Sequence, residues 1–218
     1  MVLPRRRGPL TVLCLGAHSD DIEIGCGGTI LALAAQRSIA CHWVVFSGAG
    51  GTREREAHKG ATRFLRGATE KHVTVHGFRD GFFPTTFAGI KERFEEIKGR
   101  VSPDLIFTHY RDDRHQDHRV ISDLAWNTFR SHCILEYEIP KYDGDLGRPN
   151  VYAPLTPATC TAKVRHLMAV FGSQRTKRWF TPDTFHGLMR LRGIESGATE
   201  GYAEAFHAHK LVLGAGRV

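Results

Sequence analysis

Short apolar stretches alternate with longer amphipathic stretches along most of the chain. The apolar stretches are rich in Val, Ile and Phe, are too short for helices and carry turn residues nearby, so they predict β-strands. They cover residues 10–17, 40–47, 72–76, 104–109 and 134–139. Segments with the period of a helix lie at residues 29–37, 52–65, 87–101 and 115–130. Strands that are each followed by a helix predict βαβ units.

Right-handed crossovers between such strands build a mostly parallel sheet that helices cover on both faces. We therefore expect an α/β fold of the doubly wound type, with three layers in the order α/β/α. Residues 140–157 hold several Gly and Pro residues and predict a long loop or flap before a helix at 158–171. The tail from Thr181 predicts one or two helices with glycine breaks. No change in composition marks a boundary, so we expect one domain over residues 1–218.

The composition narrows the class of protein. Of the 218 residues, 41% are hydrophobic and 24% charged, which suits a globular domain and excludes a disordered or fibrous chain. Five cysteines, an odd number without a Cys-x-x-Cys pair, favour free thiols in a reducing compartment. The run 10–17 is short for a signal core, and no apolar run approaches the ~20 residues of a membrane span. We expect a soluble, cytoplasmic protein without a membrane partner.

The net charge of +7 makes an anionic partner plausible. Apart from the run Arg5, Arg6 and Arg7, the positive charge is spread along the chain, which favours an ordinary basic surface. Nothing in the sequence resembles an aromatic-and-Arg ribonucleoprotein motif. Nucleic acid is therefore a weak lead as a partner, and assembly into a homo-oligomer is left open.

Reactive side chains follow each of the first four predicted strands. In an open α/β sheet the carboxyl ends of the strands meet at one rim, and ligands bind there. The candidates at this rim are His18, Asp20 and Asp21 after the first strand, Arg53 after the second, Asp80 after the third, and His115, Asp117 and His118 after the fourth.

Two pairs among these residues have a spacing that suits a metal ion. His18 and Asp21 are three residues apart, as are His115 and His118, and on a helical turn this spacing points both side chains the same way. Two imidazoles and one carboxylate leave one position of a catalytic zinc open for water. We assign His18, Asp21 and His118 as the ligands of one zinc ion.

The other polar groups at the rim suit hydrolysis assisted by that metal. Asp20 is expected to take a proton from the bound water, and His115 to serve the leaving group. Asp117, between the two later histidines, is placed to hydrogen-bond one of them and fix its tautomer. Taken singly, a histidine at a strand end is more often a surface residue, and Asp-Asp before a helix is often an N-terminal cap. Their combination on one rim favours a metal site.

The motifs themselves resemble those of a known family. Ala17-His18-Ser19-Asp20-Asp21, followed by Ile22-Glu23-Ile24-Gly25-Cys26-Gly27-Gly28-Thr29, and His115-Gln116-Asp117-His118 downstream are similar to the PIG-L (LmbE-like) zinc-dependent N-deacetylases. Further matches follow in that family's order at Arg53-x-x-Glu56, Asp80-Gly81, residues 103–108, Ser173-Gln174 and residues 202–206. The resemblance therefore covers nearly the whole chain.

This resemblance implies a Rossmann-like fold, one zinc ion per chain, and hydrolysis of the acetamide on an N-acetylated amino sugar to a free amine and acetate. It implies the three ligands assigned above, with Asp20 as the general base and His115 as the group that stabilises the oxyanion and assists departure of the amine. It also places Arg53 and Asp80 at positions associated with substrate contact. The family usually has Pro where this chain has Ser19, which gives the loop a freer backbone.

Three other interpretations stay open. The same ligands suit Fe(II) in an oxygen-using enzyme, although such enzymes are mostly double-sheet β proteins. The run Gly25-Cys26-Gly27-Gly28 suggests dinucleotide binding, but it lacks the G-x-G-x-x-G order directly after a strand and better suits close helix packing. The third is a non-catalytic binding protein of the same fold. For an enzyme, the net charge and Arg53 favour a small-molecule substrate that carries phosphate, such as a nucleotide sugar or phosphorylated glycoside.

Overall fold

The computed structural model describes residues 8–211, in which seven strands form one sheet in the order β3-β2-β1-β4-β5-β7-β6. The strands are β1 (Leu10–Gly16), β2 (Ile39–Val45), β3 (Glu70–Val75), β4 (Leu105–His109), β5 (Ile134–Tyr137), β6 (Val151–Leu155) and β7 (Tyr202–His207). Strands β1 to β5 pair in parallel, whereas β7 is antiparallel to both β5 and β6. The expected mostly parallel α/β sheet is confirmed.

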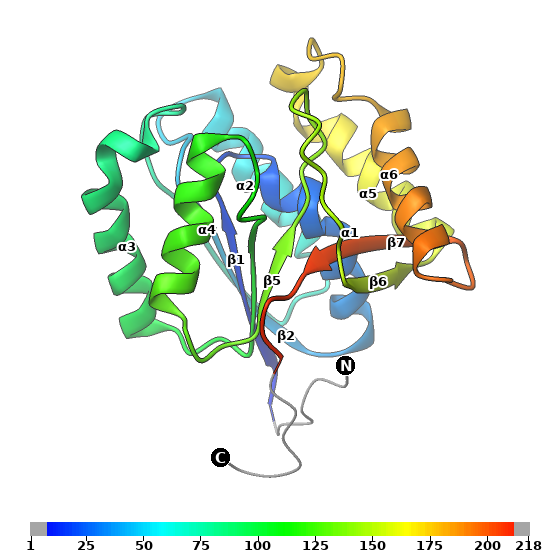
Figure 1. The fold of residues 1–218 in the computed structure, drawn as a ribbon, viewed down its shortest axis with the longest axis horizontal. Helices are drawn as coiled ribbons and strands as arrows, with labels where there is room; N and C mark the ends of the chain where they lie inside the picture. Colours follow the sequence, from blue (N-terminus) through cyan, green and yellow to red (C-terminus); the bar gives the residue numbers. More distant parts are fainter. Residues whose placement is uncertain (1–7, 212–218) are drawn as a thin grey trace.

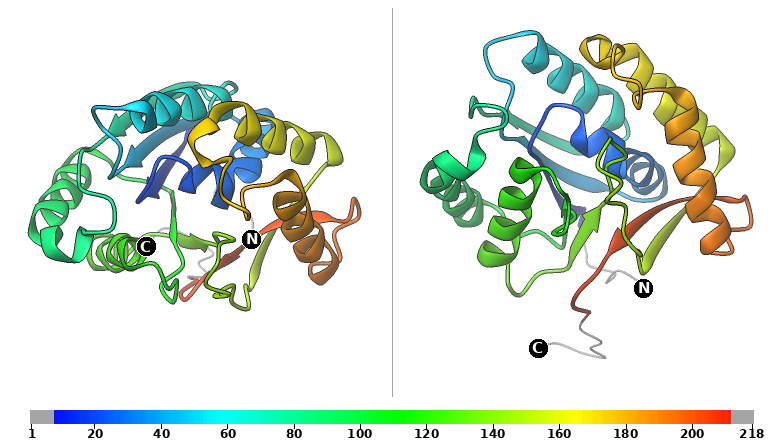
Figure 2. Two further views of the ribbon diagram at one scale, coloured as in Figure 1. Left: turned by 90° about the horizontal axis from the view of Figure 1, so that it is seen from above. Right: turned by 45° about the horizontal axis from the view of Figure 1, so that its top comes forward.

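Helices cover both faces of this sheet and make the outer two layers (Figures 1 and 2). One layer contains α1 (Asp21–Gln36), α2 (Thr52–Phe64), α5 (Pro157–Val170) and α6 (Pro182–Glu195), and the other contains α3 (Phe87–Arg100) and α4 (Gln116–Thr128). Two short 3-10 helices, η1 (Phe83–Thr86) and η2 (Gly172–Gln174), interrupt the connections. The expected three-layer fold is confirmed. Within residues 8–211 no helix is both long and apolar enough to cross a membrane.

The apolar strands form two separate cores, one on each face of the sheet. Trp43 and Phe64 lie in the core beneath α1, α2 and α5, and both are fully buried. On the opposite face the rings of Phe46, which follows β2, and Phe94 on α3 stack with their centroids 5.1 Å apart. Burial of each such side chain contributes on the order of 1.5–3 kcal/mol to folding, so these cores hold the strand ends at fixed positions.

The glycines after the first strand serve close packing. A Cβ atom at Gly25 would lie 2.2 Å from the ring of Tyr137, and one at Gly28 would lie 2.7 Å from Leu155. Because side chains at these positions would collide with the sheet, α1 can approach β5 and β6 only with glycine there. The interpretation of the glycine run as a packing device is confirmed.

Three expectations about elements were wrong. The first helix begins at Asp21 rather than at residue 29, because every residue from Asp21 to Ile30 is buried and the segment shows no helical alternation of polar and apolar positions. The segment 140–157 is not loop throughout, and the tail from Thr181 is not only helical, since they contain β6 and β7. Pro154 obscured β6, yet it is tolerated because β6 is an edge strand.

Candidate metal centre and active site

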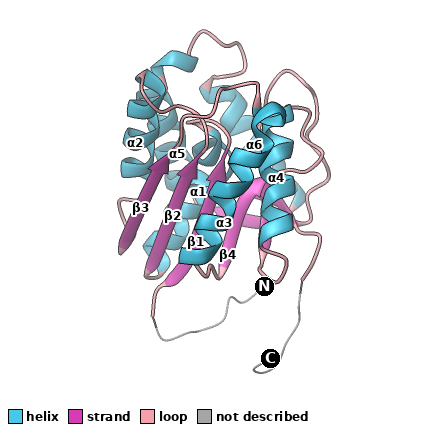
Figure 3. Cartoon of the chain, turned by 90° about the vertical axis from the view of Figure 1, so that its left-hand side faces the viewer, coloured by secondary structure: helices cyan, strands magenta, loops and turns pink. Residues whose placement is uncertain are grey.

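The carboxyl ends of the parallel strands carry a cavity of about 120 Å³. Figure 3 shows the arrows of β2 and β3 pointing toward the end of the molecule where these loops gather. Seven of the eight predicted site residues line this cavity, namely His18, Asp20, Asp21, Arg53, Asp80, His115 and His118. Residues that the sequence reasoning did not select complete its wall: Ile139, Gln174, Lys177 and Trp179.

His18, Asp21 and His118 converge on one point. His18 Nδ1 lies 3.2 Å from His118 Nε2 and 3.3 Å from Asp21 Oδ2, and His118 Nε2 lies 3.6 Å from Asp21 Oδ1. Two donor atoms that each lie about 2.0–2.1 Å from a tetrahedral zinc are about 3.3–3.4 Å apart. These three side chains therefore have the donor types and the spacing to hold such an ion.

The outer nitrogen of each candidate ligand histidine faces a carboxylate. His118 Nδ1 lies 2.9 Å from Asp113 Oδ2, and His18 Nε2 lies 3.2 Å from Asp117 Oδ2 and 3.0 Å from Asp80 Oδ1. A carboxylate in this position keeps the proton on the outer nitrogen, so the inner nitrogen presents its lone pair to a metal. This arrangement favours metal binding independently of the distances within the cluster.

The contact made by Asp117 differs from the expectation. Its carboxylate meets His18, not one of the neighbouring histidines, because it points from the first turn of α4 toward the loop after β3. There it accepts hydrogen bonds from the backbone N–H of Gly81 at 2.6 Å and of Phe83 at 3.1 Å. Asp117 thus joins the third and fourth rim segments to the first.

Asp113 is a functional candidate that the sequence reasoning missed. Although burial raises the pKa of a carboxyl group, the hydrogen bond from His118 and the charge of Lys141 hold the pKa of Asp113 well below its usual value. Lys141 Nζ lies 3.0 Å from Asp113 and also contacts Asp145. Asp113 is therefore anionic where it meets His118. Its place two residues before His115 was the signal available in the sequence.

The electrostatics differ between the two candidate ligand histidines. Burial lowers the pKa of His118, and the adjacent imidazole of His109 further disfavours a positive charge there, so the His118 imidazole is neutral and ready to bind a metal. Burial also disfavours charge on His18, but the carboxylates of Asp21 and Asp117 outweigh it and raise the pKa of His18. A bound metal would displace that proton, since imidazole ligates in its deprotonated form.

Two overlapping sets of side chains also lie close enough to share an ion, but each is less suited to it. One consists of His109, Asp113 and His118. In that set His109 Nε2 already accepts the backbone N–H of Ala17 at 3.0 Å, which uses its lone pair. The other consists of His18, Asp80 and His115, and the Asp80 side chain is 72% exposed to solvent.

Asp20 is held by an arginine rather than left free in the cavity. Its Oδ1 accepts a hydrogen bond from Arg53 Nη2, while Arg53 Nη1 donates to Glu56 Oε2 at 2.9 Å and to Ser173 Oγ at 3.2 Å. Arg53 lies in the first turn of α2, which brings the guanidinium across the end of β2 to the loop after β1. The guanidinium of Arg53 is thus engaged by protein groups, and the assignment of Arg53 as a substrate contact stays a prediction.

His115 caps the helix that carries His118. Its Nδ1 accepts the backbone N–H of Asp117 at 3.2 Å, so in the neutral imidazole the hydrogen is on Nε2. Burial lowers the pKa of His115, and the nearby imidazoles of His118 and His18 further disfavour a positive charge on it. His115 is thus a neutral N–H donor on the cavity wall.

Ser19 occupies the position where proline is usual in the resembled family. It is buried, and its hydroxyl donates a long, weak hydrogen bond of 3.5 Å to the carbonyl of Ser47. Gly48, which follows Ser47 in the chain, has a φ of +135°, and a Cβ atom at Gly48 would lie 2.7 Å from Ser19 Oγ. The serine therefore packs the first rim loop directly against the second.

The fold and this cluster define a three-layer α/β protein with a candidate His/Asp/His metal centre at the carboxyl rim of its sheet. The chain belongs to the PIG-L family, described as GlcNAc-PI de-N-acetylase, whose family model matches residues 13–129. This confirms the resemblance found in the motifs. The uncharacterized deacetylase YaiS of Escherichia coli (strain K12) is 34% identical over 148 residues, which are 62% of this chain and 76% of YaiS.

Solved structures share the architecture. N,N'-diacetylchitobiose deacetylase from Pyrococcus horikoshii aligns with a TM-score of 0.62 and 19% identity, over 91% of this chain and 83% of that one. GalB, the 4-carboxy-2-hydroxymuconate hydratase of Pseudomonas putida KT2440, aligns with a TM-score of 0.70 and 16% identity, over 96% of this chain and 100% of that one. At these identities the likeness concerns the fold, and chemistry must be argued from the site.

Proposed function

We propose that this protein is a zinc-dependent N-deacetylase that hydrolyses the acetamide of an N-acetylated amino sugar, of the N-acetylglucosamine type, to a free amine and acetate. The observation that carries the proposal is the convergence of His18, Asp21 and His118, each within 3.6 Å of another, beside the carboxylate of Asp20. Membership of a de-N-acetylase family supports the reaction class.

The donor atoms of His18, Asp21 and His118 suit a zinc ion, and these three residues would be its ligands. When bound, zinc would lower the pKa of water and polarise a carbonyl oxygen. Asp20 takes the proton of the attacking water on its Oδ2, because Oδ1 is engaged by Arg53. The water oxygen then bonds to the acetamide carbon, and the C–N bond breaks as the proton passes to the amine.

His115 and Arg53 have supporting roles in this reaction. His115 Nε2–H donates to the oxygen that becomes negative when the amide carbon turns tetrahedral, and such a donor commonly accounts for a factor of about 10²–10³ in rate. Arg53 fixes the orientation of the Asp20 carboxylate and so keeps its free oxygen turned toward the attacking water. Asp117 and Asp113 fix the tautomers of the ligand histidines.

The experiment compares protein prepared with and without a chelator, then reloaded with zinc, on a panel of N-acetylated sugars, nucleotide sugars and glycosides. We expect release of primary amine that requires the metal and falls about 10²–10⁴-fold in Asp20→Asn. We expect His118→Ala to lose bound zinc. Full activity in Asp20→Asn would overturn the role of the base, and unchanged metal content in His118→Ala would overturn the ligand set.

The same assays address the other interpretations and the finer parts of the proposal. An iron enzyme would retain Fe(II) on purification and consume oxygen, whereas the hydrolase needs neither. A binding protein without catalysis would release no amine from any substrate.

All five cysteines are unpaired, which supports a cytoplasmic location. A phosphate on the substrate and a homo-oligomeric state stay predictions.

A further inference from the structure

The cavity is too small for a whole amino sugar. Its volume of about 120 Å³ is well under the ~300–1,000 Å³ of pockets that enclose small-molecule ligands. We expect an acetamide and part of one sugar ring to fill it when the amide reaches the candidate metal centre. The rest of the substrate must then lie over the rim, so the residues at the cavity mouth decide which sugar binds.

Part of that mouth comes from one basic segment, residues 172–179, which contains η2 and precedes α6. It carries three cationic side chains, but they are placed differently. Arg175 turns back and donates to the carbonyl of Met168, and Arg178 lies outside the cavity lining. Lys177 lines the cavity, and among residues 8–211 no carboxylate forms an ion pair with it. Lys177 is therefore a cation at the mouth without a protein counter-charge.

The other cations near the site are already neutralised by protein groups. Arg53 contacts both Asp20 and Glu56, and its two terminal nitrogens are engaged. Lys141 is only 8% exposed and pairs with Asp113 and Asp145. An anionic part of a substrate would have to displace one of these pairs to reach either side chain. Lys177 needs no such displacement.

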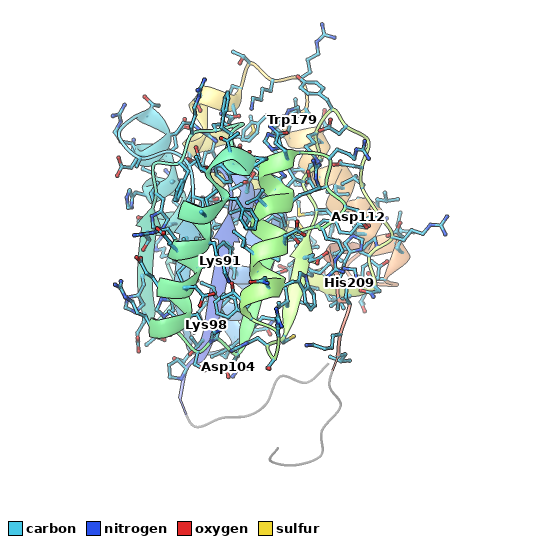
Figure 4. The ribbon with its side chains drawn as sticks, turned by 60° about the vertical axis from the view of Figure 1, so that its left-hand side comes forward. Lys91, Lys98, Asp104, Asp112, Trp179 and His209 are labelled. Atoms are coloured by element: carbon cyan, nitrogen blue, oxygen red, sulfur yellow. The ribbon has the colours of Figure 1, made fainter. Side chains whose placement is uncertain are left out.

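Trp179 lies beside Lys177 and offers an aromatic surface. It is half-buried, lines the same cavity, and its ring centroid is 5.6 Å from Lys177 Nζ. An edge contact with the buried ring of Phe180, at 5.6 Å and 69°, anchors the indole. In Figure 4 Trp179 lies at the end of the molecule opposite to Lys98. A half-buried indole that lines the cavity beside an ammonium group suits the apolar face of a sugar ring that carries an anionic substituent.

We propose that Lys177 and Trp179 form a substrate subsite in which Trp179 packs against the sugar ring and Lys177 binds an anionic substituent on it. The preferred substrate is therefore an N-acetylated amino sugar that bears a phosphate or a carboxylate group away from its acetamide. This inference rests on the proposed deacetylase activity and names the chemistry of its substrate. It also moves the anion contact from Arg53 to Lys177.

The kinetic test uses zinc-loaded enzyme and four matched substrates. They are N-acetylglucosamine, its 1-phosphate, its 6-phosphate, and a disaccharide in which N-acetylglucosamine is β-linked to a uronic acid. We expect kcat/KM to be at least about tenfold higher for one anionic substrate than for the neutral sugar. Lys177→Gln should remove most of that preference through KM. The two phosphates and the carboxylate distinguish which anion, and at which position, the subsite takes.

Two variants serve as controls. Lys98→Gln removes an exposed charge from the distant end of α3 and should leave both rates unchanged. Arg178→Gln removes a cation from the same segment but outside the cavity. If Arg178→Gln lowers the preference for anionic over neutral substrate as much as Lys177→Gln does, the preference comes from the overall positive charge of the segment. That result would overturn the subsite. Equal rates for neutral and anionic sugars in the wild type overturn it as well.

A binding measurement separates this inference from the proposed activity. In zinc-loaded Asp20→Asn, the phosphorylated sugar should alter tryptophan fluorescence with an affinity at least about tenfold above that of the neutral sugar. Trp179→Phe should abolish the signal, because Trp43 is buried in the core and Trp126 lies elsewhere on α4. Binding without amine release by the wild type would refute the deacetylase and keep the subsite. Amine release with no preference for the anionic sugar would support the deacetylase and overturn the subsite.

Discussion

Asp113 accepts a hydrogen bond from Nδ1 of His118 at 2.9 Å, so a buried carboxylate stands directly behind a candidate metal ligand. The same Asp113 accepts the backbone N–H of His115 at 2.7 Å, which fixes the loop that enters α4. One side chain thus orients both histidines of the later motif. Its effect on a metal would be indirect, through the tautomer and position of His118.

Replacing Asp113 should therefore weaken metal binding without removing a ligand. We expect Asp113→Ala to raise the dissociation constant for zinc about 10–100-fold, because His118 then loses the partner that keeps its proton on Nδ1. Competition with a chromophoric chelator measures the constant. Asp112→Asn, at the exposed neighbouring position, is the matched control and should bind zinc as the wild type does. Equal affinity in the two variants would contradict the role given to Asp113.

Arg53 provides a second test, of catalysis rather than metal binding. We expect Arg53→Gln to lower kcat about 10–100-fold while zinc content stays at the wild-type level, since a misplaced Asp20 no longer faces the attacking water. The measurements are steady-state kinetics and metal analysis of the same preparation. Arg55→Gln, exposed on the same helix, should change neither. Loss of zinc in Arg53→Gln would point to a structural role instead.

The first half of the fold was predictable because its signals are local. Strands β1, β2, β4 and β5 lie in short apolar runs, and β3 shows alternating valines at its end. The rule that ligands bind at the carboxyl ends of a parallel sheet then placed His18 and His118 on one rim. The start of α1 was not predictable from periodicity, since Asp21 to Ile30 is buried all round and has no polar face. Amphipathicity identifies only helices that keep one side in water.

The missed site residues depend on tertiary contacts. Lys177 and Trp179 reach the cavity because Ser173, just before them, donates its backbone N–H and its hydroxyl to Glu56 on α2, at 2.9 and 2.6 Å. That contact joins positions 117 residues apart in the sequence, so no local sequence pattern predicts it. Asp113 reaches His118 through a turn closed by its own N–H on the carbonyl of Tyr110. Orientation of this kind follows from the folded loop and not from spacing.

Glu204 on β7 is a buried tie between the antiparallel edge and α1. Its carboxylate accepts the backbone N–H of Gly28 at 2.8 Å and of Thr29 at 2.7 Å, and it pairs with the buried ammonium of Lys163. Gly28 and Thr29 lie on α1 and Lys163 lies on α5, so this one carboxylate joins β7, α1 and α5. Removing it would leave the charge of Lys163 unpaired in the interior.

We therefore expect Glu204→Ala to lower the free energy of unfolding by about 3–5 kcal/mol, a large share of the ~5–15 kcal/mol typical of a domain. Urea denaturation followed by circular dichroism measures the loss. Glu200→Ala, on the exposed turn before the same strand, should change the free energy by no more than about 0.5 kcal/mol. A change in Glu204→Ala as small as that of the control would show that the buried network contributes little.

His207 at the end of β7 is buried without a hydrogen-bond partner for its Nε2 among the described side chains. Its ring stacks on Tyr110 with centroids 3.9 Å apart and an angle of 15°. Burial lowers the pKa of His207 to about 4, against an ordinary value near 6.5. The unfolded chain therefore binds a proton at this residue in a pH range where the folded chain does not.

That difference makes stability depend on acidity in a known direction. Between pH 6.5 and 4 the unfolded state holds more protons than the folded state, so the free energy of unfolding falls as the pH falls. His207 alone should cost about 3 kcal/mol across this window. His207→Gln should show a shallower decline between pH 7.5 and 4.5 in urea denaturation, whatever its stability at pH 7.5. Parallel curves for wild type and His207→Gln would mean that His207 binds its proton equally well in the folded and unfolded chains.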